Sequence, residues 1–192
     1  RGRRLLRGAA TRSVPASPAP SLPHTPCVPS RCGWLVGGRP FEEIAQPADE
    51  IECLWCAPAT LDLAGAEIGL GTVVAREQRL NNALREYLRE EEAAGRRYDY
   101  VFIDCPPSLG LLTVNAFDAA SEVLIPIQCE YYALEGLSQL LNSIQLLQKH
   151  LNPDLSLSTI LLTMFDRRTN LSTQVAEDVR SHFPQQVLKG TI

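Results

Sequence analysis

The chain has 192 residues, of which 45% are hydrophobic and 21% are charged, and its formal net charge is −4. This length suits one domain with a hydrophobic core rather than two. No apolar run approaches the roughly 18–20 residues that span a bilayer, which excludes an integral membrane protein. The charge is uneven, because residues 1–40 hold seven Arg and no Lys, Asp or Glu, whereas residues 41–192 hold 11 basic and 22 acidic residues.

Residues 1–33 are rich in Arg, contain six Pro and show neither helical nor strand periodicity. Proline removes a backbone donor and fixes φ, so we expect a disordered, extended arm without a helix or a paired strand. Three interpretations stay open: an organelle transit peptide, a basic arm for nucleic acid or an anionic surface, or a segment without an evolved role. We favour the last, because the bias toward Arg, Gly, Ala and Pro is typical of GC-rich DNA read outside its frame.

From Trp34 onward, apolar runs alternate with amphipathic segments. The runs predict strands at 52–57, 98–104, 123–127, 158–164 and 187–192. Leucines at helical spacing predict helices at 77–94 and 133–151, and a third helix is expected from Asn170, as its N-cap, to residue 183. Continuous apolar strands alternating with helices indicate an α/β fold, doubly wound, with a mostly parallel sheet covered on both faces.

Polar residues follow several of these strands, at the edge where open parallel sheets bind ligands. Asp104 ends an apolar strand, which is the usual setting of a Walker B aspartate that holds the hydration shell of a nucleotide-bound Mg²⁺. A solvated or turn-capping Asp is the alternative, and position alone favours it. Further polar groups at strand ends are Gln128, Cys129, Glu130, Thr163 and Asp166.

Three segments carry a resemblance to a known family: IDCPPSLG at 103–110, QCEYYALEGL at 128–137 and LLTMFDRRTN at 161–170. In this order and spacing they resemble the ParA/Soj family of partition ATPases, and the likeness covers residues 34–192. The resemblance implies a deviant-Walker P-loop NTPase fold in a cytoplasmic, nucleoid-associated bacterial protein. It also implies binding of ATP and Mg²⁺, a nucleotide-sandwich homodimer, nonspecific DNA binding and hydrolysis stimulated by a ParB-like protein.

The resemblance implies roles for single residues that match the family's motifs by position. Asp104 corresponds to the Walker B aspartate, which would hold Mg²⁺ through water. Met164 corresponds to the wall of the adenine pocket, and Arg168 to an arginine implicated in DNA binding. A guanidinium in an exposed loop can contact phosphate without reading bases, although a solvated surface charge is the alternative for Arg168. The switch segment that senses the γ-phosphate corresponds to Cys105, Pro106 and Pro107.

The family's phosphate loop, KGGxGKT, has no counterpart in this sequence. The chain has two lysines, Lys149 and Lys189, and neither follows a glycine. The DxDPQG element that activates the attacking water and the later PRxxRxxEAP segment are also missing. We therefore expect an incomplete fragment that lacks the phosphate-loop strand beside 98–104, has no intact catalytic residues, binds little ATP and dimerises poorly.

The leading hypothesis is a ParA-like protein in chromosome or plasmid segregation whose chain lacks the ATP loop. The alternative is a non-enzymatic pseudo-ATPase that binds DNA or a ParB-like partner, and the third is a fragment without activity. The spacing of Cys27, Cys32, Cys53 and Cys56 invites a zinc-ribbon interpretation. Because Cys53 and Cys56 lie three apart in a strand and point to opposite faces, we disfavour zinc.

Overall fold

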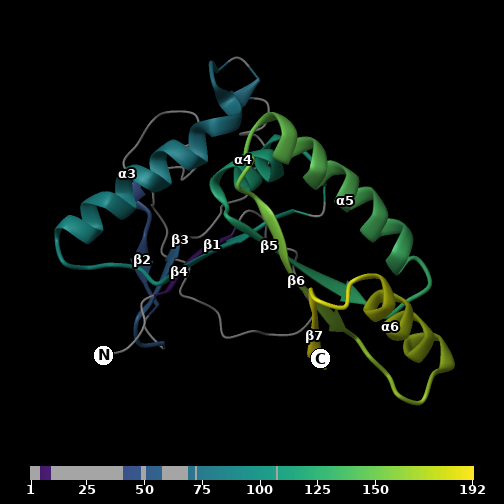
Figure 1. The fold of residues 1–192 in the computed structure, drawn as a ribbon. Helices are drawn as coiled ribbons and strands as arrows, with labels where there is room; N and C mark the ends of the chain where they lie inside the picture. Colours follow the sequence, from purple (N-terminus) through teal and green to yellow (C-terminus); the bar gives the residue numbers. More distant parts are fainter. Residues whose placement is uncertain (1–4, 10–40, 49–50, 58–68, 72, 107) are drawn as a thin grey trace. The chain divides into compact units, whose positions relative to one another are not determined.

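The computed structural model describes residues 5–9, 41–48, 51–57, 69–71, 73–106 and 108–192, with the backbone alone for 5–9. The chain divides into two compact units, Arg1–Ala119 (unit 1) and Ala120–Ile192 (unit 2). Figure 1 shows the helices and strands of each unit in the colours of the sequence. Each unit combines a largely parallel sheet with helices, which confirms the predicted α/β class.

The described residues of unit 1 form a four-stranded sheet in the order β2-β3-β1-β4. Its strands are β1 (Leu5–Ala9), β2 (Gln46–Pro47), β3 (Leu54–Ala57) and β4 (Tyr100–Asp104). β1 runs parallel to both β3 and β4, whereas β2 is antiparallel to β3. The register places Ala9 beside Asp104, so β1 and β4 end at the same edge of the sheet.

The strand β1 corrects the expectation that residues 1–33 contribute no paired strand. Leu5–Ala9 lies in the middle of the sheet and pairs with β4, so the position beside β4 that was expected to be missing is filled. The prolines that argued against pairing begin at Pro15, and the sequence LLRGA keeps every backbone N–H donor. The prolines themselves and the domain boundary expected at residue 33 lie outside the described residues.

Unit 1 also contains the 3₁₀ helices η1 (Phe41–Glu43) and η2 (Arg76–Gln78) and the α-helices α3 (Arg79–Ala93) and α4 (Leu111–Ala119). η2 and α3 together confirm the helix predicted at 77–94. It ends as its glycine predicts: Gly95 has a φ of 76°, its N–H donates to Glu92 O, and the Arg96 N–H donates to Glu91 O. Helix α4 was not predicted from the sequence, because it is apolar around most of its circumference and is largely buried.

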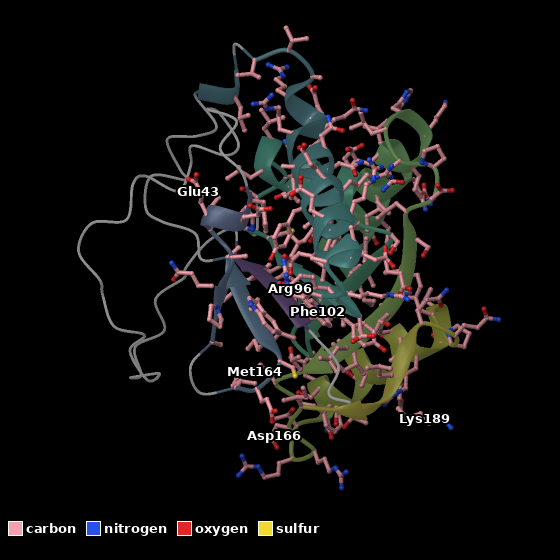
Figure 2. All side chains as sticks on the ribbon, turned by 90° about the vertical axis from the view of Figure 1, so that its left-hand side faces the viewer. Glu43, Arg96, Phe102, Met164, Asp166 and Lys189 are labelled. Atoms are coloured by element: carbon pink, nitrogen blue, oxygen red, sulfur yellow. The ribbon has the colours of Figure 1, made fainter. Side chains whose placement is uncertain are left out.

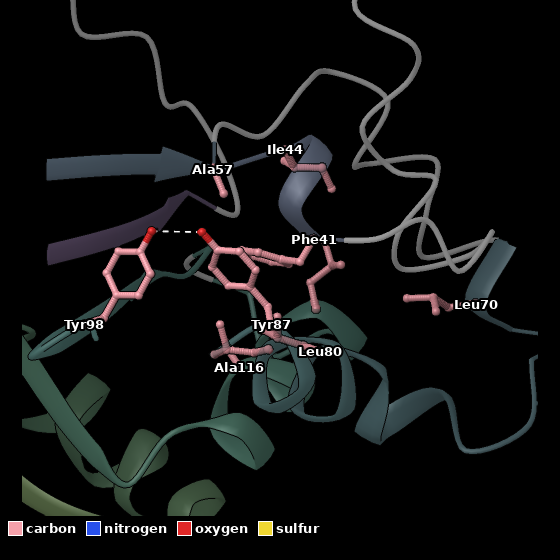
Figure 3. Close-up of a cluster of buried hydrophobic side chains, with 10 residues drawn as sticks. Phe41, Ile44, Ala57, Leu70, Leu80, Tyr87, Tyr98 and Ala116 are labelled. Carbon is pink, nitrogen blue, oxygen red and sulfur yellow. Dashed lines mark hydrogen bonds between the residues drawn. The ribbon is translucent and has the colours of Figure 1, made fainter. Parts of the chain in front are cut away.

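The core of unit 1 lies between the sheet and α3 and α4 (Figure 3). Leu80 and Leu84 of α3 contribute aliphatic surface, as their spacing predicted. The Tyr87 and Tyr98 hydroxyls lie 2.8 Å apart in a hydrogen bond that satisfies both polar groups inside the core. The Tyr98 ring meets Trp55 edge to face at 5.6 Å between centroids, a favourable geometry for aromatic rings.

The described strands of unit 2, β5 (Glu122–Gln128), β6 (Ser156–Thr163) and β7 (Val187–Thr191), form a parallel sheet in chain order. The helices α5 (Ala133–His150) and α6 (Asn170–His182) connect them, and α5 contacts both β5 and α6. The strands and helices predicted for this region are confirmed. Figure 1 shows α5 and α6 in green and yellow beside the sheet.

In two of the described strands, the side chains on the two sides of the strand differ in exposure. In β5, Val123, Ile125 and Ile127 are buried, whereas Leu124 between them is 48% exposed. In β4, Phe102 is 50% exposed and its neighbours Val101 and Ile103 pack against the core. One side of each of these two strands is therefore buried in its unit, and the other side carries a partly exposed apolar side chain.

Candidate functional site

The strand β4 carries Asp104 to the carboxyl edge of the unit 1 sheet, as predicted. Its side chain is exposed, and its backbone pairs with that of Ala9 at the end of β1. A carboxylate oxygen at a strand tip is the donor type that Mg²⁺ prefers, often through water. Asp104 can therefore serve a hydrated cation at this edge.

Cys105 follows Asp104 and is half-buried, with its Sγ 3.7 Å from the Ile103 carbonyl oxygen, to which the thiol donates. Burial, and secondarily the Asp104 carboxylate, raise the pKa of Cys105 to about 11. The thiol therefore stays protonated at neutral pH and is a packing group rather than a nucleophile. Pro106 is also half-buried, whereas Pro107 lies outside the described residues.

Helix α4 begins soon after this segment and is fixed by polar side chains that were not predicted from the sequence. Asn115 is 1% exposed; its Oδ1 accepts from the Leu80 N–H at 3.1 Å, and its Nδ2 donates to Arg76 O at 2.8 Å and Leu111 O at 2.9 Å. Asn81 of α3 donates to the Asp118 carboxylate at 2.9 Å. An isolated Asn inside an apolar run was the only sequence signal for this clamp between α3 and α4.

In unit 2, the carboxyl ends of β5 and β6 are joined by hydrogen bonds. The Cys129 N–H donates to Thr163 O at 3.0 Å, and the Thr163 hydroxyl donates to Ile127 O at 3.1 Å. The Ser172 hydroxyl of α6 donates to Cys129 O at 3.2 Å. Burial raises the pKa of the Cys129 thiol, although Arg180 opposes this. These contacts connect the end of β5 to the end of β6 and to the start of α6.

Met164 and Arg168 lie in the loop that follows β6 and leads to α6. Met164 has a φ of 55° in the left-handed region and is 67% exposed. An exposed, strained residue at a strand end is typical of a binding surface. The Arg168 side chain is 88% exposed, and Figure 2 labels Met164 and Asp166 of the same loop.

The loop ends at the N-cap of α6, which corrects one prediction. Thr169, rather than Asn170, is the N-cap: it is extended, and its hydroxyl accepts from the Ser172 N–H at 3.4 Å. Thr and Asn both serve as N-caps, so the residue types alone did not decide between them.

The predicted site residues thus form two groups, one in each unit. Asp104, Cys105 and Pro106 are consecutive at the edge of unit 1, and Met164 and Arg168 share one loop in unit 2. The two lysines of the chain do not fit a phosphate loop, because Lys149 lies in the last turn of α5 and Lys189 lies in β7.

Two negative findings concern the described residues alone. None of their helices is long and apolar enough to cross a membrane. Within the same part of the chain, no cluster of three or more His, Cys, Asp or Glu side chains could hold a metal ion. Cys53 lies in the turn before β3, with a φ of 63°, and Cys56 lies in β3, whereas Cys27 and Cys32 lie outside the described residues.

Comparison with known proteins places this geometry in a class. A family model described as an AAA domain (AAA_31) matches residues 30–157. The chain resembles the crystal structure of cobyrinic acid a,c-diamide synthase from Mycobacterium smegmatis with bound ATP analog and magnesium, with a TM-score of 0.80 and 35% identity. This similarity covers 100% of this chain and 75% of that chain. The fold is therefore that of the P-loop NTPases.

Sequence relatives narrow the class to a family. The chain is 56% identical over 145 residues to the sporulation initiation inhibitor protein Soj of Bacillus subtilis, covering 76% of this chain and 54% of that protein. It is 54% identical over 155 residues to the chromosome partitioning protein ParA of Myxococcus xanthus, covering 81% of this chain and 52% of that protein. The chain belongs to the ParA/Soj family, and it spans about half the length of these two relatives.

Proposed function

We propose that the protein acts in DNA partitioning, of a chromosome or a plasmid, and that Arg168 contacts DNA phosphates without reading the base sequence. The observation that carries the proposal is the exposed Arg168 side chain, at 88% exposure, in the loop before α6. Membership of the ParA/Soj family supports the same function. The setting would be the bacterial cytoplasm, at the nucleoid.

The guanidinium chemistry accounts for nonspecific binding. The Asp166 carboxylate accepts hydrogen bonds from Nε and Nη2 of Arg168. The N–H donors on Nη1 are then directed away from the carboxylate. Donors at an exposed loop can bond to backbone phosphates of any sequence. Each neutralised phosphate releases counterions, so the affinity should fall as salt rises, with a log–log slope of about 0.9 per contact.

The test is fluorescence anisotropy of a labelled short duplex of arbitrary sequence, titrated with the protein. Arg168→Ala should weaken binding about three- to tenfold and reduce the salt slope by about 0.9. Arg85→Ala is the matched control, because it removes the same charge from an exposed position on α3. Equal binding by wild type and Arg168→Ala would refute the assignment.

A second candidate is a non-enzymatic pseudo-ATPase module that binds DNA or a ParB-like partner. The observation that favours it is the position of the two lysines, Lys149 at the end of α5 and Lys189 in β7, outside any phosphate-binding turn. Without the phosphate cradle and its lysine, several charge-assisted hydrogen bonds of about 1.5–3 kcal/mol each are missing. Asp104 would then hold no nucleotide-bound Mg²⁺ in this chain.

Binding of a fluorescent ATP analogue in the presence of Mg²⁺, with ATP competition, separates the two candidates. We expect no saturable binding and no change with Asp104→Ala. Saturable micromolar binding that is lost in Asp104→Ala would make the chain a nucleotide-binding partition protein. We also propose a ParB-like protein and a second copy of the chain as partners. Since the family's dimer needs bound nucleotide, we expect the chain to be monomeric without it.

A further inference from the structure

Asp166 and Arg168 form a forked ion pair within the loop before α6. The Arg168 Nε lies 3.0 Å from Asp166 Oδ1 and 3.2 Å from Oδ2, and its Nη2 lies 2.9 Å from Oδ2. One side of the guanidinium therefore meets both oxygens of the carboxylate. Carboxylate and phosphate offer the same pair of acceptor oxygens to this fork.

The backbone fixes the carboxylate in this position. The Arg168 N–H donates to Asp166 Oδ1 at 2.9 Å, and the Thr169 hydroxyl donates to Asp166 O at 3.0 Å. Thr169 in turn caps α6, and Ser172 ties that helix to the carbonyl of Cys129. The carboxylate is thus held by the fold beside the arginine, and it does not depend on the flexible guanidinium alone.

We propose that the Asp166 carboxylate is an intramolecular competitor for the DNA phosphate that Arg168 binds. It occupies the guanidinium fork and cancels its charge, so DNA gains full access to Arg168 only by displacing the carboxylate. This inference rests on the proposed function, because it assumes that Arg168 contacts DNA.

The charges at the loop support competition at neutral pH. The Arg168 guanidinium holds the pKa of Asp166 below its usual range, so the carboxylate stays ionised there. Asp166 likewise raises the pKa of Arg168. The pair is exposed to solvent, with side-chain exposures of 40% for Asp166 and 88% for Arg168, so water and salt screen its attraction and a phosphate can replace the carboxylate.

A positioning role for Asp166 makes the opposite prediction. If the carboxylate served mainly to aim the guanidinium at DNA, its neutralisation would weaken binding. If it competes, neutralisation strengthens binding and adds a counterion-dependent contact. The sign of the change therefore separates the two roles.

Asp166→Asn is the variant of choice, because the amide oxygen can still accept from the Arg168 N–H while the charge is lost. In the anisotropy assay it should bind the duplex about two- to fivefold more tightly than wild type at low salt. The salt slope between about 50 and 200 mM NaCl should steepen by up to about 0.9. Asp178→Asn is the control, since it removes the same charge from the exposed side of α6.

The double variant Asp166→Asn/Arg168→Ala completes the test. It should bind as Arg168→Ala does, because the carboxylate acts only through the guanidinium. Weaker or unchanged binding by Asp166→Asn, with Arg168→Ala still impaired, overturns the competition alone. Unimpaired binding by Arg168→Ala overturns the proposed DNA contact as well. An equal gain in affinity in Asp178→Asn would mean that the loss of one negative charge anywhere explains the effect, which would overturn the proposal. Circular dichroism checks that each variant is folded.

Discussion

In each unit, the carboxyl ends of the strands form one edge of the sheet, and the two edges differ in how their polar side chains are held. At the unit 1 edge, the segment after Asp104 leads into α4, where Asn115 is 1% exposed and makes three hydrogen bonds. At the unit 2 edge, the loop after β6 carries the exposed Met164 and Arg168 and the half-buried Asp166, which is paired with Arg168. Helix α4, which follows Asp104, is fixed by buried neutral hydrogen bonds, whereas the loop after β6 carries an exposed ion pair.

This difference indicates what each edge can contribute. Buried neutral hydrogen bonds have a high cost when broken, so the unit 1 segment should keep one geometry. Exposed charges exchange partners with little cost, which suits the unit 2 loop to the DNA contact that we propose for Arg168. Substitutions in unit 1 should therefore change stability, whereas those in the unit 2 loop should change binding more than stability.

Asn115→Ala should have the largest effect on stability. It removes the acceptor of the Leu80 N–H and the side-chain donor to the Arg76 and Leu111 carbonyl groups, which should lower the free energy of unfolding by about 3 kcal/mol. Urea unfolding followed by tryptophan fluorescence measures this change, because both tryptophans, Trp34 and Trp55, belong to unit 1.

The control for this prediction is Asn82→Ala, which removes an exposed amide from the same helix α3. Its unfolding free energy should stay within about 0.5 kcal/mol of wild type. A loss in Asn82→Ala equal to that in Asn115→Ala would mean that helix propensity, rather than the buried clamp, determines the result.

Thr169→Ala should have a smaller effect, confined to unit 2. Removing the N-cap hydroxyl leaves the Ser172 N–H without its acceptor, and caps of this type contribute about 1 kcal/mol. Hydrogen exchange at the amides of α6 measures the change, with Gln174→Ala as an exposed control on the same helix. If exchange in α6 were unchanged, the cap would not stabilise this helix, and the two edges would differ less than we argue.

The sequence predicted most elements of unit 2, because its strands and helices have clear side-chain patterns. β1 was missed because Leu5–Ala9 has no alternation, and a central parallel strand needs only backbone donors and acceptors between its neighbours. Helix α4 was missed because a helix that is apolar on most sides has no stripe to detect. Both failures concern elements that packing, rather than periodicity, specifies.

For the candidate site, the sequence placed Asp104 at a strand tip and Arg168 in an exposed loop, and the structure agrees with both positions. It did not predict the contact between Asp166 and Arg168, because residues two apart meet only where a turn brings them together. It also gave no partner for Asn115, whose contacts with Arg76 and Leu80 span more than 30 residues of chain. Long-range polar contacts of this kind leave no local pattern.

The smallest effect on stability at neutral pH is expected from the ionisation of Cys105. Its pKa is raised on folding from 9.0 to about 11, mainly by burial. A raised pKa means that the protonated thiol stabilises the fold fully below the unfolded pKa, and that this contribution is lost as the pH rises through about 11. Near pH 8, the folded chain should therefore hold about a hundredfold less Cys105 thiolate than the chain unfolded in urea.

Alkylation by iodoacetamide, followed at Cys105 by mass spectrometry, measures this difference. In the folded protein the rate should keep rising beyond pH 9 and level off near pH 11, whereas in urea it should level off near pH 9. A folded-state rate that already levels off at pH 9 would mean that solvent reaches this thiol freely. The unit 1 edge would then be as open as the loop around Arg168, and the contrast between the two edges would be lost.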